Sequence, residues 1–318
     1  MLVRLTRVDN VDLSLFRHDF DLTWMAFFMN ANEQIYGRFG SRDANGPDTR
    51  NSLAGLKHAM EEILTVHQKK REAPAKRKPI FIRQFAAVRN YRGCIHCHQV
   101  KEIQRAELKR TGKWDREMLW RYPLPENIGL TLDLDQGNVV RSVQAKSASA
   151  QVGIVAKDKV KSINGVPVYS IADASHALDQ APKEGEIDVV WSRGGKEHRA
   201  KLELKSGWRR TNITWRPSML DLIPSLPLFG EDLSAAEKKR LGLSAKRLAF
   251  RQENQVHDEA RRAGIRGGDV IIGLNDRKLE MDVITFLGHV RRYHLVGETV
   301  TINVMRGGRR VDVKMRLR

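Results

Sequence analysis

The sequence predicts an α+β protein in which a partial α/β segment precedes two copies of one module. Residues 149–166 and 260–277 are similar to each other, which indicates a repeat. In both copies an apolar strand-like run, an amphipathic helix and a hairpin follow in the same order. The segment 1–68 has no counterpart elsewhere in the chain and combines strand-like runs with one amphipathic helix.

Composition sets the broad class. The chain has 318 residues, of which 41% are hydrophobic and 30% charged, and its net charge of +18 favours anionic partners. The basic residues are spread along the chain, however, and the one dense run, Lys69–Lys78, contains Ala and Pro and is typical of a solvated linker. No nucleic-acid-binding motif accompanies it, so we expect no nucleic-acid partner. No apolar run is long enough for a transmembrane segment.

The repeat has a fixed spacing. The residues Gly153, Ile154, Asp158 and Asn164 match Gly264, Ile265, Asp269 and Asn275, all at the same offset along the chain. The tripeptide that begins at Arg193 recurs at Arg306, at a slightly larger offset, where each copy turns through Gly-Gly into its last strand. We therefore expect two modules of about 80 residues each.

A helix is predicted in the middle of each module. Helical spacing places apolar side chains on one face in both copies. These residues are Ile171, Ala174 and Leu178 in the first copy and Val283, Phe286, Leu287 and Val290 in the second.

The order of elements, together with AGIRGGDVI at Ala263–Ile271, resembles a PDZ domain of the bacterial type attached to HtrA-like proteases. The resemblance implies that a strand, entered through a Gly-Leu-Gly-Phe-like loop, receives a peptide or a protein C-terminus beside the following helix. The matching residues are Ile128, Gly129, Leu130 and Thr131 in the first copy and Leu248, Ala249, Phe250 and Arg251 in the second. The second loop has Ala249 where the family has its central glycine, and the first copy has Lys157 where the family has the glycine before Asp158.

HtrA-like proteases carry their serine in a Gly-Asn-Ser-Gly-Gly setting, which this chain lacks. We therefore expect no serine protease activity from these residues, and whether the chain is an enzyme stays open.

The N-terminal segment looks like the second half of a thioredoxin fold. Strands are expected at Leu2–Val8, at Thr23–Asn30 and after the turn that follows, and a helix places Leu53, Leu56, Met60, Ile63 and Leu64 on one face. Thioredoxins hold a cis-proline where this chain has Leu22. The alternative is a small α+β element unrelated to thiol chemistry.

The chain as a whole resembles a bacterial family that pairs a thioredoxin-like domain with tandem PDZ domains, on DLTWMAFFMN, YPLPENIGL and GWRRTNITWRPSML. The resemblance implies that the N-terminus is incomplete, through a wrongly assigned start codon or an interrupted reading frame. Some members carry selenocysteine, and a selenocysteine codon read as a stop would leave a chain that begins at a downstream methionine such as Met1. The protein would then be periplasmic or attached to the cell envelope. As written, without a signal peptide, the sequence predicts a cytoplasmic protein.

The two cysteines of the chain, Cys94 and Cys97, form a Cys-x-x-Cys-His motif with His98. This spacing is typical of c-type haem attachment, in which two thiols bind the porphyrin and the histidine binds the iron. Met118 is the expected sixth ligand, ahead of His58 and His67.

Three alternatives to haem remain open for this motif. A redox dithiol would normally sit in an intact thioredoxin fold. A disulfide between Cys94 and Cys97 would close too small a loop to add much stability. A zinc site would need a fourth ligand beyond His96 or His98.

Together these observations predict five segments. They are a thioredoxin-like half at 1–68, a basic linker with the Cys-x-x-Cys-His motif at 69–125, PDZ domains at 126–206 and 245–318, and a linker at 207–244. The favoured function is a cell-envelope adaptor that binds peptides or protein C-termini and carries a redox centre serving a redox partner. The alternatives are a thiol or selenol oxidoreductase whose dithiol lies upstream of Met1, and a PDZ scaffold without redox function.

Overall fold

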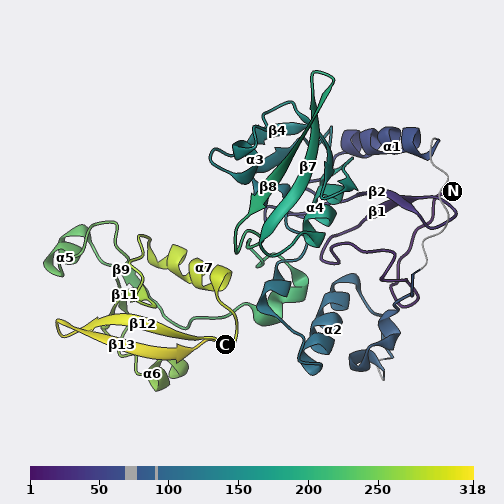
Figure 1. Ribbon diagram of the computed structural model, residues 1–318. Helices are drawn as coiled ribbons and strands as arrows, with labels where there is room; N and C mark the ends of the chain where they lie inside the picture. Colours follow the sequence, from purple (N-terminus) through teal and green to yellow (C-terminus); the bar gives the residue numbers. More distant parts are fainter. Residues whose placement is uncertain (69–76, 90–91) are drawn as a thin grey trace. The chain divides into compact units, whose positions relative to one another are not determined.

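The computed structural model describes residues 1–68, 77–89 and 92–318 (Figure 1). Most of the basic run predicted as a linker, residues 69–76, lies outside this range. The chain divides into two compact units, Met1–Ser218 and Met219–Arg318, and their boundary falls inside the segment predicted as the second linker. No helix among the described residues is long and apolar enough to cross a membrane.

The N-terminal unit begins with an irregular segment and a hairpin. The strands β1 (Ala26–Met29) and β2 (Ile35–Phe39) pair antiparallel, in agreement with the second and third predicted strands. The strand predicted at Leu2–Val8 does not form, and the side chains of Leu2, Val3 and Leu5 are exposed. Nothing pairs with that run among the described residues, so its apolar alternation alone does not make a strand.

Helix α1 (Leu53–His67) forms where it is predicted, but it buries a different face. Its buried residues are Gly55, Ala59 and Ile63, whereas Leu53, Met60 and Leu64 are mostly exposed. The reason is steric: a methyl group on Gly55 would collide with the carbonyl oxygen of Leu134, so only a small residue allows this close approach. The small-residue face therefore packs on the first module.

The Cys-x-x-Cys-His segment folds into short helices around a small core. They are η1 (Ile82–Gln84), η2 (Ala86–Val88), α2 (Cys97–Arg110) and η3 (Arg116–Leu119). The core side chains are Val8, Leu13, Phe20, Ile82, Val88, Ile95 and Val100.

The first module completes the N-terminal unit. Its elements are η4 (Pro125–Ile128), β3 (Leu130–Leu132), β4 (Val140–Val143), α3 (Ala148–Gln151), β5 (Lys159–Ile163), β6 (Val166–Pro167), α4 (Ile171–Gln180), β7 (Gly185–Arg193) and β8 (Lys196–Leu204). They form a two-stranded sheet, β3-β4, and a four-stranded sheet in the order β6-β5-β7-β8. The predicted face of α4 is confirmed, because Ile171, Ala174 and Leu178 all join the core of this module.

The C-terminal unit contains the second module. After η5 (Pro217–Leu222), which crosses the boundary, come β9 (Gly230–Asp232), α5 (Ala235–Arg240), β10 (Phe250–Gln252), α6 (Asp258–Ala263), β11 (Val270–Leu274), α7 (Val283–Tyr293), β12 (Thr299–Arg306) and β13 (Arg309–Arg316). One sheet runs in the order β13-β12-β11-β10-β9. Phe286 and Val290 of α7 are fully buried in its core, with Val283 and Leu287 packed at the margin.

The predicted hairpins are confirmed in both modules. β7 pairs with β8 and β12 with β13, and in each turn the two glycines have positive φ angles, 55° and 81° in the first and 55° and 75° in the second. Two consecutive positive φ angles are the geometry of a tight hairpin turn that glycine adopts without steric cost.

Candidate peptide grooves and the CxxCH segment

In the first module the predicted peptide-binding residues lie together at the start of β3. Ile128 ends η4, Gly129 adopts a left-handed conformation with φ of 86°, and Leu130 and Thr131 lie in the strand. β3 pairs with β4 along one edge, and no other described strand pairs with it. The side chains of Ile128 and Leu130 share one core with α4, so the strand and the helix pack on the same core, as the two walls of the expected peptide groove would.

In the second module the predicted residues lie in the wrong strand for this role. Phe250 and Arg251 belong to β10, which pairs with β11 on one side and β9 on the other. Leu248, Ala249 and Phe250 have no exposed surface. A peptide cannot add to a strand whose two edges are already hydrogen-bonded, so Leu248–Arg251 is not the receiving edge.

The hydrogen bonds identify β9 as the counterpart of β3. In the first module the Val140 N–H donates to the Asp158 carbonyl at 2.8 Å, and in the second the Gln252 N–H donates to the Asp269 carbonyl at 2.8 Å. β4 and β10 are therefore equivalent strands. Because β3 pairs with β4 and β9 pairs with β10, β9 is the edge strand that corresponds to β3.

The equivalence of β3 and β9 cannot be recognised in the sequence, because the two strands pair with their partners in different registers. Val140 pairs with Leu132 and Gln252 pairs with Gly230. The chain between the two strands is longer in the second module and contains α5. The constant spacing between the two copies therefore does not extend to the strands β3 and β9 at the start of the modules. Only the short apolar run Leu226–Phe229, before Gly230, could have indicated the true strand.

The loop before β9 differs chemically from a loop that holds a carboxylate. Pro227 has no N–H group, the Leu228 N–H donates to the Leu226 carbonyl at 2.8 Å, and the Phe229 N–H donates to the Gln252 side chain at 3.1 Å. Backbone N–H groups that already donate within the fold are not available to a peptide carboxylate.

Helix α7 is the counterpart of α4 and lies beside β9 in this module. By the repeat, Val283 and Leu287 occupy the positions of Ile171 and Ser175, and both of the α7 residues are partly exposed. The Asp232 carboxylate, at the end of β9, accepts hydrogen bonds from the Val283 N–H at 3.1 and 3.2 Å. This contact fixes the helix start against the end of the edge strand.

The Cys-x-x-Cys-His motif lies at the start of α2. Ile95 is buried in the small core, while Cys94 and Cys97 are exposed thiols on either side of it. The His98 Nδ1 atom is 3.0 Å from Glu102 Oε1. This contact uses Nδ1, so Nε2 is the ring nitrogen that Glu102 does not bond. The anchoring of Ile95 thus presents both thiols at the surface, as covalent attachment of a group would require.

The acidity of Cys97 bears on the dithiol alternative. Although Cys97 is exposed and begins a helix, the atoms packed around its thiol partly desolvate it and raise the pKa of the thiol. Reactive dithiols depend on a thiol whose pKa is lowered, so this environment does not favour a catalytic dithiol.

The other predicted ligands have separate surroundings. Met118 lies partly buried in η3, the His58 ring bonds to the Asn138 side chain at 3.2 Å, and the His67 ring bonds to the Tyr36 hydroxyl at 3.1 Å. Across the part of the chain that the structure describes, no group of three or more His, Cys, Asp or Glu residues could hold a metal ion.

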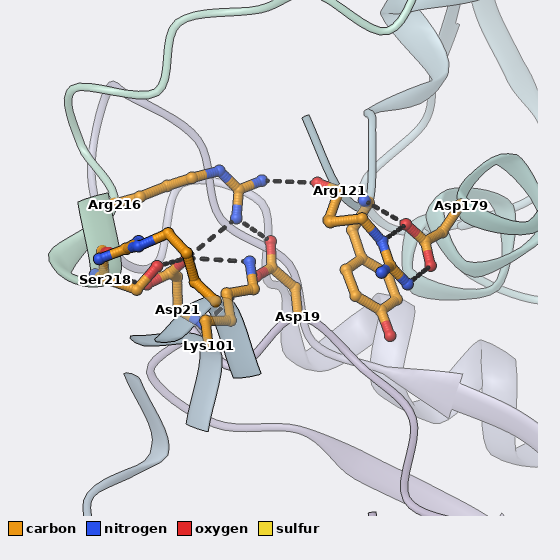
Figure 2. A network of polar contacts seen from close by, with 9 residues as sticks. Asp19, Asp21, Lys101, Arg121, Asp179, Arg216 and Ser218 are labelled. Atoms are coloured by element: carbon orange, nitrogen blue, oxygen red, sulfur yellow. Dashed lines mark hydrogen bonds and ion pairs between the residues drawn. The ribbon is translucent and has the colours of Figure 1, made fainter. Parts of the chain in front are cut away.

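A buried ionic cluster fixes α2 within its unit (Figure 2). Lys101 of α2 bonds to Asp19 and Asp21, and Arg216 bonds to the same two carboxylates, at 2.6 Å to Asp19 and 3.2 Å to Asp21. Burial alone would raise the pKa of Asp19, but the charges of Arg216 and Lys101 hold it well below its usual value. Ser218 closes the cluster by donating from its backbone and hydroxyl to Asp21, each at 2.9 Å.

Sequence comparison finds related proteins among periplasmic proteases. The chain is 28% identical over 177 residues to a protein of Haemophilus influenzae described as "Probable periplasmic serine protease do/HhoA-like", covering 54% of this chain and 34% of that protein. It is 26% identical over 151 residues to "Periplasmic serine endoprotease DegP" of Salmonella typhimurium, covering 48% and 29%. The match thus spans about a third of the relatives' length. No protein-family model matches the chain.

Comparison with solved structures gives only distant superpositions. An HtrA-type protease, AlgW with a tripeptide, is 15% identical and covers 56% of this chain and 58% of that one, with a TM-score of 0.27. A photosystem II D1 C-terminal processing protease is 17% identical, covering 38% and 36%, with a TM-score of 0.22. Scores this low do not establish a common arrangement of the whole chain.

Proposed function

We propose that the protein is a peptide-binding adaptor of the bacterial cell envelope, built on two PDZ-type modules, and that the groove between β9 and α7 is its accessible receptor. The observation that carries this proposal is the edge position of β9, which pairs only with β10 among the described strands. An unpaired edge beside an apolar helix face accepts an extended peptide through backbone hydrogen bonds. The periplasmic relatives support a cell-envelope location.

The loop before β9 bears on the class of peptide. With Pro227 in that loop and the N–H groups of Leu228 and Phe229 already bonded, a terminal carboxylate finds few donors there. We therefore expect the second module to prefer extended internal segments with alternating apolar side chains over free C-termini.

The test substitutes the helix wall of this groove. Leu287→Gln should weaken binding of a fluorescein-labelled pool of alternating apolar peptides by at least about tenfold, because it removes roughly 1.5–3 kcal/mol of apolar contact. The matched control is Ile284→Gln on the same helix, whose side chain is 80% exposed and outside the groove. Fluorescence anisotropy measures both affinities. Equal weakening by the two variants, or none by either, would refute a receptor at α7.

A second candidate function concerns the Cys-x-x-Cys-His motif. We propose that Cys94 and Cys97 would attach a c-type haem whose iron His98 and Met118 would hold, which would make the adaptor part of an electron-transfer system. The exposure of both thiols supports this proposal, and the raised pKa of Cys97 weighs against the dithiol alternative. Such a haem would supply one-electron chemistry.

Expression in a host that attaches haem tests this proposal. We expect a Soret-absorbing species that survives denaturation and disappears in Cys94→Ala/Cys97→Ala. If the protein carries no haem but its thiols oxidise and reduce reversibly, the oxidoreductase alternative gains instead. A protein with neither property would be a PDZ scaffold without redox function.

A further inference from the structure

Residues 37–55 of the N-terminal segment pack on the groove of the first module. At one end, the Arg38 N–H donates to Asp173 Oδ1 at 2.8 Å, and the Ser170 hydroxyl donates to the Arg38 carbonyl oxygen. A Cβ atom on Gly37 would lie 3.2 Å from the Tyr169 ring and 3.3 Å from the Asp173 carboxylate, so β2 packs closely against these residues. These contacts place β2 across the start of α4, the helix wall of the groove.

The segment continues along α4 toward the loop before β3. Gly40, Ser41 and Arg42 enclose a cavity of about 20 Å³ together with Leu124 and Ser175, among other residues. At the far end, Arg50 bonds to Glu126 of η4 at 2.5 Å and to Asp43 at 2.6 Å. The chain thereby reaches the loop that leads into Ile128 and Gly129.

The segment then returns at the other end of the strand wall. The Ser52 hydroxyl donates to the Leu134 carbonyl at 3.0 Å, and Gly55 lies against that same oxygen. Its contacts thus lie at both ends of the groove and along the helix between them.

The effect on α4 is visible when the two modules are compared. The side chain of Ser175 on α4 lines the cavity with Arg42 and is 8% exposed. At the equivalent position of α7, Leu287 remains partly exposed. This position of the helix is therefore covered in the first module and open in the second.

We propose that residues 37–55 are an internal occupant of the first peptide groove, so that a peptide reaches this groove only by displacing them. The inference rests on the proposed function, because it assumes that the module's groove binds peptides. The occupant is a segment of this chain, and its competitor is an extended peptide of the class that β9 would accept.

The packing of the occupant suits displacement. Arg42 Nε, Ser175 Oγ and His176 Nδ1 are buried in this region and have no hydrogen-bond partner among the described residues. Each unsatisfied buried polar atom costs about 1–3 kcal/mol, so the closed arrangement is less stable than its contacts suggest. An incoming peptide that exposes or satisfies these atoms recovers part of that cost.

The test opens the groove and asks whether it binds. Arg50→Glu places a third carboxylate beside Asp43 and Glu126, and Gly55→Val collides with the Leu134 carbonyl. Lys57→Glu makes the same charge change on the exposed face of α1 and serves as the control. Amide NMR of the full chain, titrated with the pool of alternating apolar peptides, reports each groove separately.

In the wild type and in Lys57→Glu we expect shifts at β9 and α7 only. In Arg50→Glu and in Gly55→Val, amides of β3 and α4 should shift as well, at peptide concentrations at least tenfold lower than any that affect them in the wild type. Unchanged dispersion of the signals from the N-terminal unit verifies folding, and Arg50→Gln provides a milder opening if either variant unfolds.

Two results distinguish a failure of the internal occupant from a failure of the proposed peptide-binding function. If β3 and α4 respond in the wild type as readily as in the opened variants, or respond in none of them while β9 responds, the internal occupant is refuted and peptide binding stands. If neither groove responds in any variant, the proposed function itself fails.

Discussion

Arg193 and Arg306 explain why the repeat is visible in the sequence. Arg193 forms two hydrogen bonds of 2.7 Å to Asp158 and one to the Gly153 carbonyl. Arg306 forms the same three bonds, also at 2.7 Å, to Asp269 and the Gly264 carbonyl. A bidentate pair to a buried carboxylate depends on both partners, so the two motifs recur together.

Three buried titratable side chains make the stability of the N-terminal unit depend on pH between pH 5 and 6. Burial raises the pKa of Asp173 to about 7, although Arg38 opposes this effect. Burial lowers the pKa of His18 to about 4 and that of His176 to about 3. In the folded protein between pH 5 and 6, Asp173 is therefore protonated while the two histidines are neutral; in the unfolded chain each of the three groups has the opposite state.

The sign of the pH effect follows from these protonation states. Unfolding takes up two protons on the histidines and releases one from Asp173, so the N-terminal unit gains about 1.4 kcal/mol of stability per pH unit as pH rises from 5 to 6. Asp173→Asn removes the opposing group, and the slope should roughly double. Urea unfolding at several pH values measures this slope; an unchanged slope in Asp173→Asn would contradict the protonated state.

Helix α2 buries few apolar side chains, and polar contacts hold it in the fold. Its buried residues are Val100, Lys101 and Arg105, two of which are basic. Lys101 reaches the cluster with Asp19 and Asp21, and Arg105 donates to the Ser218 carbonyl at 2.7 Å. The Cys-x-x-Cys-His motif is therefore positioned by buried ion pairs as much as by apolar packing.

Removing one partner of this cluster should be costly. Arg216→Ala leaves Asp19 and Asp21 with one buried cation, Lys101, and should lower the unfolding free energy of the N-terminal unit by about 3–5 kcal/mol. Arg210→Ala breaks an exposed pair with Glu117 and serves as the control, with an expected loss of about 0–1 kcal/mol. Chemical denaturation measures both, and similar losses would show that the cluster does not hold α2.

The sequence predicts some helices and strands of this protein better than others. The helices α4 and α7 and the Gly-Gly hairpins follow directly from periodicity and turn residues, because local pattern and tertiary packing agree there. In α1 they disagree: its leucines predict one face, but close approach to Leu134 selects Gly55 and Ala59. The edge strand β9 was missed because its pairing depends on a partner beyond an inserted helix, which no local pattern reveals.

The polar contacts between residues 37–55 and the first module also could not be predicted from the sequence. They join residues far apart in the chain, such as Arg38 with Asp173 and Arg50 with Glu126. The chain is so rich in charged residues that residue type alone does not predict which of them pair. The sequence predicts the pair of modules, but it does not predict the contacts that residues 37–55 make with the first of them.

The two compact units of the chain should respond to substitution separately. Each has its own hydrophobic core, and each has buried carboxylates whose charge is balanced by an arginine of the same unit. Arg306→Gln leaves the carboxylate of Asp269, a residue that is only 2% exposed, without its bidentate partner. The expected cost to the C-terminal unit is about 1–3 kcal/mol.

Combining this variant with Arg216→Ala tests the independence of the units. We expect each single variant to lower the stability of its own unit only, and the double variant to show both losses, additive within about 0.5 kcal/mol. Hydrogen exchange of amides in β5 and β11, read in one experiment, separates the two units. If Arg306→Gln also accelerates exchange in β5, the units unfold together, and opening the first groove would then alter the second.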